Sequence, residues 1–196
     1  MLTNLSDRYA SAFTIAFKLH QEQSRKGSQI PYIAHLISVS AIVLENGGSE
    51  NQAIAALLHD AVEDQGGRPT LQIIRDSFGD DVARIIEGCT DAFTDPKPPW
   101  KERKIDYLEK LKTAPDEILL VSLADKLHNA RSILQDLLTE GDALWEKFNG
   151  KKAGTLWYYQ SLANIFDSSS FPSLSNELRH LVEEIITVSN LLESAV

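Results

Sequence analysis

Apolar residues recur at helical spacing through almost the whole chain. Tyr9, Ala12, Phe13, Ala16 and Phe17 repeat every three or four positions, the period of an amphipathic helix. The same period predicts helices over about 5–21, 32–44, 49–64, a short stretch from 70, 80–89, 101–112, 115–138, 144–148, 154–166 and 175–193. No useful stretch alternates apolar and polar residues as a half-buried strand does. We therefore expect an all-α fold, a compact bundle of many helices.

Glycine and proline mark where these helices end. Breaks are expected at 27–31, 46–48 and 66–67, and the segment 95–100 with its three prolines is expected to be the longest loop. Ser49 and Thr70 are the residue types that accept hydrogen bonds from the first amides of a helix, and we expect each to begin one. The helix after Ser49 is expected to run without interruption to Asp64.

Length and composition indicate one globular domain. The chain has 196 residues, of which 43% are hydrophobic and 24% charged, which is ordinary for a folded protein. We expect a single domain over 1–196, with a core over about 5–166 and a C-terminal helix at about 175–193 packed on it. Cys89 is the one cysteine, which excludes an intrachain disulfide and fits a reducing compartment. With no signal-peptide pattern and no long apolar run, a cytoplasmic location is expected.

The charge balance limits the partners. A formal net charge of −9 disfavours a nucleic-acid polymer or an anionic membrane as partner. A small phosphorylated molecule stays compatible with this charge if basic residues cluster locally or a cation is bound. The sequence leaves the oligomeric state open.

One helix concentrates acidic and imidazole groups on a single face. His59, Asp60, Glu63 and Asp64 project within an arc of about 140° at 100° per residue, while apolar residues fill the opposite side. Adjacent carboxylates repel one another unless a cation or protons neutralise them. Imidazole with carboxylate is a normal ligand set for a divalent metal. The alternative is a solvated acidic face.

Two further polar residues interrupt apolar helices. Asp125 follows a nearly continuous apolar run, where a carboxylate is costly unless it is paired or binds a metal. The alternative for Asp125 is an ion pair with Lys126 or Arg131. His35 lies on the helix over 32–44, and a lone histidine there is also compatible with a satisfied core residue.

In combination, these residues resemble the H…HD…D signature of the HD superfamily of metal-dependent phosphohydrolases. The resemblance extends to the hydrolase domain of the RelA/SpoT alarmone enzymes and to the stand-alone small alarmone hydrolases. It rests on RKGSQIPYIAH at 25–35, AALLHDAVED at 55–64, FGDDVARIIEGCTD at 78–91 and LADKLHNAR at 123–131. Leu36, Ala61 and the segment 65–67 depart from the common pattern and suggest the stand-alone branch. The synthetase domain of the long members is not expected in 196 residues.

The resemblance implies a metal-dependent HD-domain bundle that hydrolyses the 3′-pyrophosphate of (p)ppGpp-type alarmones of the stringent response. The products would be GDP or GTP and pyrophosphate. One divalent ion, manganese in this family, would be bound by His35, His59, Asp60 and Asp125. The ligand types also admit other transition metals. Glu63 and Asp64 would orient water and move a proton, in agreement with their i, i+4 relation to the His-Asp pair.

The resemblance also implies a nucleotide-binding set. Arg25 would pack on the guanine ring and Lys26 would approach a phosphate or the base. The remaining candidates for substrate binding are Asn129, Ser132, Lys101 and Arg103, and Lys104 beside the last two could also meet the phosphates. Without the resemblance, the basic residues would be read as solvated cations.

Two other functions remain compatible with the same residues. The first is another HD nucleotide phosphohydrolase that acts on an adenine alarmone, on NADPH or as a nucleotidase. The second is a non-catalytic module that binds alarmone. His20 and His128 lie near the same strings and are expected to be structural.

Overall fold

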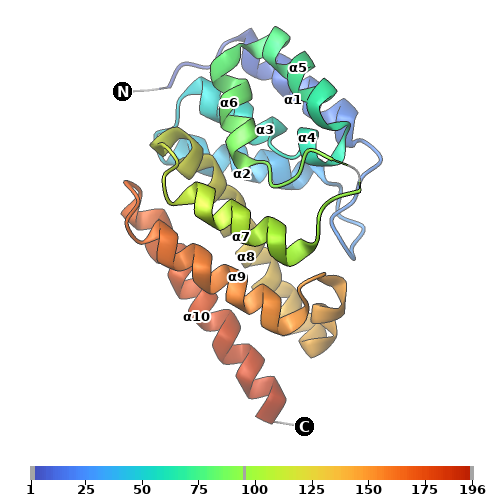
Figure 1. Cartoon of the computed structure of the whole chain (residues 1–196), viewed down its shortest axis with the longest axis vertical. Helices are drawn as coiled ribbons and strands as arrows, with labels where there is room; N and C mark the ends of the chain where they lie inside the picture. The colour runs from blue at the N-terminus through green and yellow to red at the C-terminus, as the bar shows by residue number, and fades with distance from the viewer. Residues whose placement is uncertain (1–2, 95, 195–196) are drawn as a thin grey trace.

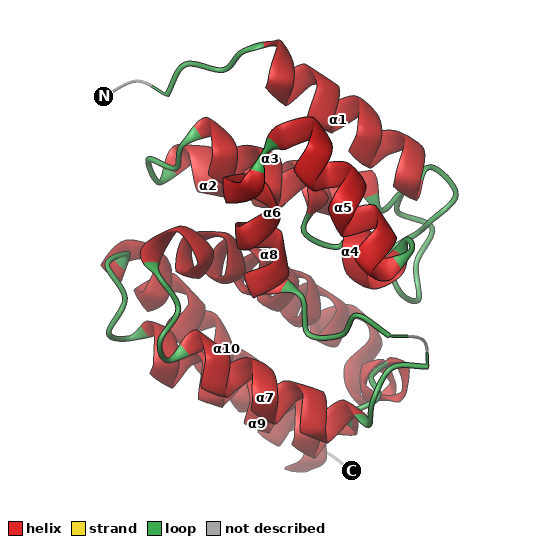
Figure 2. Cartoon of the chain, turned by 45° about the horizontal axis from the view of Figure 1, so that its top comes forward, coloured by secondary structure: helices red, strands yellow, loops and turns green. Residues whose placement is uncertain are grey.

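The computed structural model describes residues 3–94 and 96–194, and within them every regular element is a helix (Figures 1 and 2). The one β-type contact there is an isolated antiparallel bridge between Ser24 and Pro31. The predicted all-α fold is confirmed. Asp95, in the predicted proline-rich loop, lies outside the described residues, as do positions 1–2 and 195–196 at the ends of the expected domain.

The helices follow one another closely along the chain. They are α1 (Asp7–His20), α2 (Ile33–Glu45), α3 (Glu50–Leu58), α4 (Ala61–Asp64), α5 (Gly67–Phe78), α6 (Asp80–Cys89), α7 (Trp100–Leu111), α8 (Asp116–Glu140), the 3-10 helix η1 (Gly141–Lys147), α9 (Lys151–Phe166) and α10 (Pro172–Ser194).

Helices α3 and α8 lie at the centre of the fold. Residues 53–58 of α3 are fully buried, because α3 packs against α1, α2, α6 and α8. Helix α8 packs on α2, α3 and α6 on one side and on α9 and α10 on the other, so it joins the two halves seen in Figure 1. Asp125 in the middle of α8, and His59 directly after α3, are therefore buried inside the molecule.

The boundaries of α8 follow from its end residues. Pro115 precedes the helix with an extended backbone, and Asp116 and Glu117 place negative charge in the first turn, where the helix dipole favours it. Gly141 ends the helix at φ 63°, a conformation that glycine adopts without strain. The resulting 25-residue helix carries Asp125 in its buried middle.

Two predictions about helix boundaries were wrong. The helix begun by Ser49 is not continuous to Asp64, because α3 ends at Leu58 and the short α4 starts at Ala61, with His59 and Asp60 in a turn between them. Thr70 does not begin a helix. It lies inside α5, which starts at Gly67, and its hydroxyl donates to the carbonyl of Gln65.

The C-terminal helix α10 packs on α8 and α9. Leu178, Val182 and Ile185 of α10 are buried and join the main apolar cluster. Within residues 3–94 and 96–194, no helix combines the length and the apolar content that crossing a bilayer requires.

Candidate functional site

Four side chains from distant parts of the sequence meet where α2, the α3–α4 turn and α8 come together. The Nε2 atom of His59 lies 3.1 Å from Oδ2 of Asp60 and 3.5 Å from Oδ1 of Asp125. The Nε2 atom of His35 lies 3.6 Å and 3.2 Å from the same two oxygens. The candidate ligand atoms of His35, His59 and Asp125 all lie within 4.8 Å of one another. One ion would therefore reach all four residues.

The hydrogen bonds of the two imidazoles fit this ligand role. The Nδ1–H of His59 donates to the carbonyl of Ala56 at 2.8 Å, and Nδ1 of His35 lies 2.8 Å from Nδ1 of His128. Both Nε2 atoms are buried and have no hydrogen-bond partner among the described residues. In a metal-binding histidine, one ring nitrogen usually makes a hydrogen bond that fixes the ring, and the other nitrogen stays free to bind the metal. The residues present therefore fit a divalent ion.

The electrostatics favour positive charge at the same point. Burial raises the pKa of Asp60 and Asp125, but the His59 ring beside Asp60, and Lys126 together with both histidines beside Asp125, hold these pKa values well below the usual range. Burial lowers the pKa of His59, yet the two carboxylates raise it overall. Two buried carboxylates that stabilise positive charge on a neighbouring group indicate a place for a cation.

Neighbouring residues fix the two carboxylates. The Tyr32 hydroxyl donates to Oδ2 of Asp60 at 2.7 Å. Oδ1 of Asp125 accepts from Nδ2 of Asn129, and Oδ2 accepts from Nζ of Lys126, both at 2.6 Å. Of the ion-pair partners considered for Asp125, Lys126 is therefore the one it contacts. Asp125 therefore forms an ion pair with Lys126 and, at the same time, lies close to His35 and His59.

The Glu63 and Asp64 carboxylates lie beside this centre and are held by a cation from the loop before α7. Nζ of Lys97 donates to Oε1 of Glu63 at 2.9 Å and to Oδ1 of Asp64 at 3.3 Å. Nε2 of Gln23 donates to the other oxygen of Asp64 at 3.0 Å. Burial and the nearby Asp91 charge raise the pKa of Glu63, although Lys97 opposes the rise. A raised pKa suits a group that moves a proton.

Asp91 anchors the start of α7 against the site. Its side chain is 3% exposed and accepts from Arg103 and from Lys104. Burial raises the pKa of Asp91, but Lys104 and Arg103 lower it to about 2. Arg103 also donates to the carbonyl of Pro98 and is buried. The loop that carries Lys97 is thus connected to the core.

A cavity of about 810 Å³ opens beside the centre. The residues predicted to bind substrate that line it are Arg25, Lys26, Asn129 and Ser132, together with Asp64. The Arg25 guanidinium donates to Oδ1 of Asn129 at 2.6 Å and lies over the Tyr32 ring, 5.6 Å from its centre. The structure therefore brings most of the predicted nucleotide-binding set to one surface.

The other two predicted substrate-binding residues do not line this cavity. Nζ of Lys101 lies over the Trp157 ring, 2.9 Å from its centre, and Arg103 is engaged by Asp91. The basic residue of α7 that faces the cavity is Lys104, and Lys126 of α8 faces it as well.

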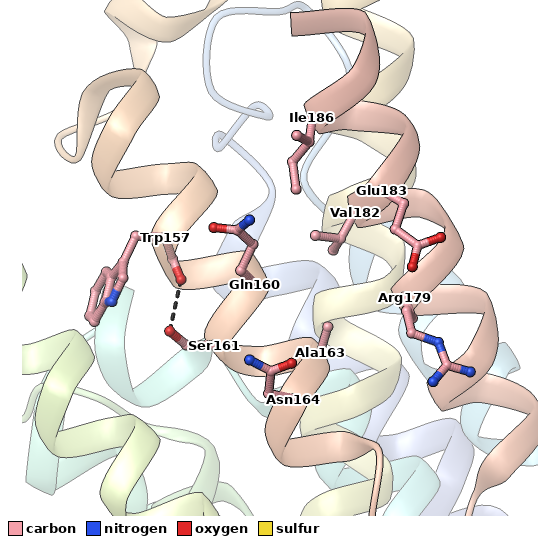
Figure 3. Close-up of a pocket in the computed structure, with 9 residues that line it drawn as sticks. All are labelled: Trp157, Gln160, Ser161, Ala163, Asn164, Arg179, Val182, Glu183 and Ile186. Atoms are coloured by element: carbon pink, nitrogen blue, oxygen red, sulfur yellow. Dashed lines mark hydrogen bonds between the residues drawn. The ribbon is translucent and has the colours of Figure 1, made fainter. Parts of the chain in front are cut away.

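A second hollow of about 490 Å³ lies between α9 and α10 (Figure 3). It uses the face of α9 that carries Trp157, Gln160 and Ser161, whereas Thr155 and Tyr158 of the same helix face the larger cavity. Figure 3 shows Ser161 hydrogen-bonded to the Trp157 carbonyl. None of the predicted site residues lines this hollow, whereas several line the larger cavity, so the larger cavity is the candidate site.

Several site residues were missed by sequence reasoning. Tyr32 lies three positions before His35, so helical spacing could have indicated a shared face. His128 was expected to be structural, and its contact with His35 agrees with that role. No sequence pattern signals the contacts of Lys97 and Gln23, because they join segments more than 30 residues apart.

Comparison with solved structures supports the same fold. A metazoan orthologue of SpoT, described as hydrolysing ppGpp, superposes with a TM-score of 0.75 at 26% identity, covering 93% of this chain and 97% of that one. A protein from Listeria monocytogenes EGD-e superposes with a TM-score of 0.68 at 32% identity, covering 78% of this chain and 99% of the other.

Sequence relatives fall into a short and a long group. MESH1 of Xenopus tropicalis, a guanosine-3′,5′-bis(diphosphate) 3′-pyrophosphohydrolase, is 40% identical over 125 residues, which is 62% of this chain and 67% of that protein. Human MESH1 is 38% identical with the same coverage. A probable guanosine-3′,5′-bis(diphosphate) 3′-pyrophosphohydrolase of Synechocystis is 34% identical, but the match spans only 16% of its length. The HD domain model matches residues 12–156, and the chain therefore belongs to the HD-domain family.

Proposed function

We propose that this protein is a metal-dependent hydrolase that removes pyrophosphate from the 3′ position of (p)ppGpp-type alarmones. The observation that carries the proposal is the meeting of His35, His59, Asp60 and Asp125, with two buried imidazole nitrogens free, beside a cavity lined by Arg25. The similarity to the short MESH1 relatives and to the SpoT orthologue supports the substrate class.

The metal ion and the two acidic residues Glu63 and Asp64 would have separate roles in the reaction. When bound, the divalent ion would supply Lewis-acid activation of water and of the phosphoryl group. Glu63 and Asp64, held by Lys97, orient the water and accept its proton. The bond between phosphorus and the ribose 3′ oxygen breaks, the 3′ oxygen takes up a proton, and pyrophosphate leaves with the oxygen of the water.

Arg25 and the residues around it would position the nucleoside in the cavity. Arg25 is held by Asn129 and by the Tyr32 ring, so its planar guanidinium is oriented before substrate arrives. It offers a stacking surface for a purine, and Lys26 and Ser132 provide donors nearby. Because Asn129 also donates to Asp125, base binding and the metal centre share one residue.

The metal we propose is manganese. Two imidazole nitrogens, of His35 and His59, and two carboxylate oxygens, of Asp60 and Asp125, would form a mixed ligand set that manganese accepts. We also infer a cytoplasmic location, where nucleotide alarmones occur and where the unpaired thiol of Cys89 stays reduced.

Turnover of a nucleotide panel tests this function. The protein is incubated with manganese and, separately, with ppGpp, pppApp, NADPH and dGTP, and released pyrophosphate, phosphate and nucleotide are quantified. We expect ppGpp to give equimolar GDP and pyrophosphate. Faster turnover of NADPH or pppApp would favour another HD nucleotide phosphohydrolase. Binding of ppGpp with no product from any compound would favour a non-catalytic module.

A further inference from the structure

Two buried hydroxyls in the wall of the large cavity have no hydrogen-bond partner within the part of the chain that the structure describes. Thr155 and Tyr158 lie on one face of α9, are 4% and 5% exposed, and line the cavity. Neither Oγ1 of Thr155 nor Oη of Tyr158 makes a hydrogen bond to any described residue. An unsatisfied buried hydroxyl is costly, so hydroxyls of residues that line a cavity indicate a place where water or a ligand completes their hydrogen bonds.

Two ammonium groups line the same cavity. Lys104 extends from α7 and Lys126 from α8, and their side chains are 17% and 14% exposed. Nζ of Lys104 lies 5.0 Å from the centre of the Tyr158 ring. Among the contacts of the described residues, each ammonium donates one hydrogen bond, Lys104 to Asp91 and Lys126 to Asp125. Up to two N–H groups of each lysine remain for a ligand.

The two lysine cations repel one another. Burial lowers the pKa of Lys104, and the positive charge of Lys126 lowers it further, against the attraction of Asp91. An anion bound near both lysines would relieve this repulsion. Tetrahedral oxyanions such as phosphoryl groups accept several charge-assisted hydrogen bonds at once.

We infer that Lys104, Lys126, Thr155 and Tyr158 form a subsite for a phosphoryl group of the substrate. The inference rests on the proposed function in taking the anion to be part of the nucleotide. Lys126 contacts Asp125, so the subsite adjoins the proposed metal centre, in the cavity that Arg25 also lines. The phosphoryl group belongs either to the leaving pyrophosphate or to the 5′ diphosphate.

The test measures binding of inorganic pyrophosphate to the metal-loaded protein by titration calorimetry. Tyr158→Phe and Thr155→Val remove only the free hydroxyls, and Lys104→Gln removes one charge. Each loses a hydrogen bond to an anion, so each should weaken pyrophosphate about tenfold. Lys110→Gln, on the exposed side of α7, is the charge-matched control and should bind like wild type. Thermal unfolding checks that each variant is folded.

A parallel titration with GDP identifies the source of the phosphoryl group. Weaker pyrophosphate binding with unchanged GDP binding would assign the subsite to the leaving group, whereas an equal loss for both would assign it to the 5′ diphosphate. Pyrophosphate and GDP affinities in Tyr158→Phe and Thr155→Val that match those of Lys110→Gln would overturn the subsite. Because these titrations require no turnover, a wild type that binds pyrophosphate here but leaves ppGpp intact would refute the proposed function alone.

Discussion

Asp91 gives the most quantitative prediction about the fold around the site. Its pKa of about 2, against an ordinary value of 3.8, means that the folded state prefers the ionised carboxyl. The difference of about 1.8 between the two pKa values corresponds to roughly 2 to 3 kcal/mol, since one pKa unit is about 1.4 kcal/mol. The side chain is 3% exposed, so solvent screening removes little of this. Asp91→Asn keeps the shape and removes the charge, and should lose roughly 2 to 3 kcal/mol at pH 7.

The contribution of Asp91 to the free energy of unfolding should decrease as the pH falls. A carboxyl whose pKa is depressed in the folded state contributes fully above pH 3.8 and loses its contribution as pH falls through 2. The gap between wild type and Asp91→Asn should therefore shrink to roughly 1 kcal/mol at pH 3. Urea unfolding followed by circular dichroism at pH 7 and pH 3 measures both values.

A surface ion pair provides the control for Asp91. Asp81 pairs with Arg84 but is 68% exposed, so Asp81→Asn should cost less than about 1 kcal/mol. If Asp91→Asn is no less stable at pH 7 than Asp81→Asn, the buried pairing of Asp91 with Arg103 and Lys104 does not stabilise the fold as argued.

Three further substitutions test the site. Glu63→Gln should retain the metal and lower kcat about 10²-fold or more, because proton transfer is lost; normal turnover would exclude its role. Arg25→Ala should raise KM for ppGpp more than it lowers kcat, since it removes the stacking surface, and an unchanged KM would contradict that role. Tyr32→Phe removes the hydrogen bond to Asp60 and should weaken metal affinity about tenfold, measured by competition with a chelator; wild-type affinity would show that this contact does not matter.

Sequence reasoning located the four candidate metal ligands better than the local structure around two of them. His59 and Asp60 were placed together because the motif holds them adjacent, and the structure confirms that they meet His35 and Asp125 in space. The turn between α3 and α4 was missed, because both residues keep right-handed helical backbone angles that no local propensity distinguishes. The break is set by tertiary packing around the centre.

The start of α5 was missed for a different reason. Gly66 and Gly67 were taken as a break, and they do carry positive φ angles of 121° and 64°. The helix nevertheless begins at Gly67, and Pro69 is compatible with a first turn because its missing amide hydrogen has no partner there. Thr70 donates back to Gln65 instead of accepting from a following amide.

The part of the cavity wall formed by α7 and α9 could not be derived from the sequence. Which face of α9 meets the cavity depends on how that helix packs on α7 and α8, so the place of Tyr158 in the wall needs the tertiary structure. The same applies to α7, where Lys104 faces the cavity although Lys101 lies one turn away on the same basic stretch. These assignments need the tertiary structure.

Metal content measured together with turnover tests the central claim most directly. Wild type and Asp60→Ala are purified, loaded with manganese, desalted and analysed for bound metal by mass spectrometry, and the same samples are assayed for pyrophosphate release from ppGpp. We predict one ion per chain and turnover in wild type, and neither in Asp60→Ala with the fold intact. Full turnover by a metal-free wild type, or unchanged metal and rate in Asp60→Ala, would contradict a hydrolase built on this four-residue centre.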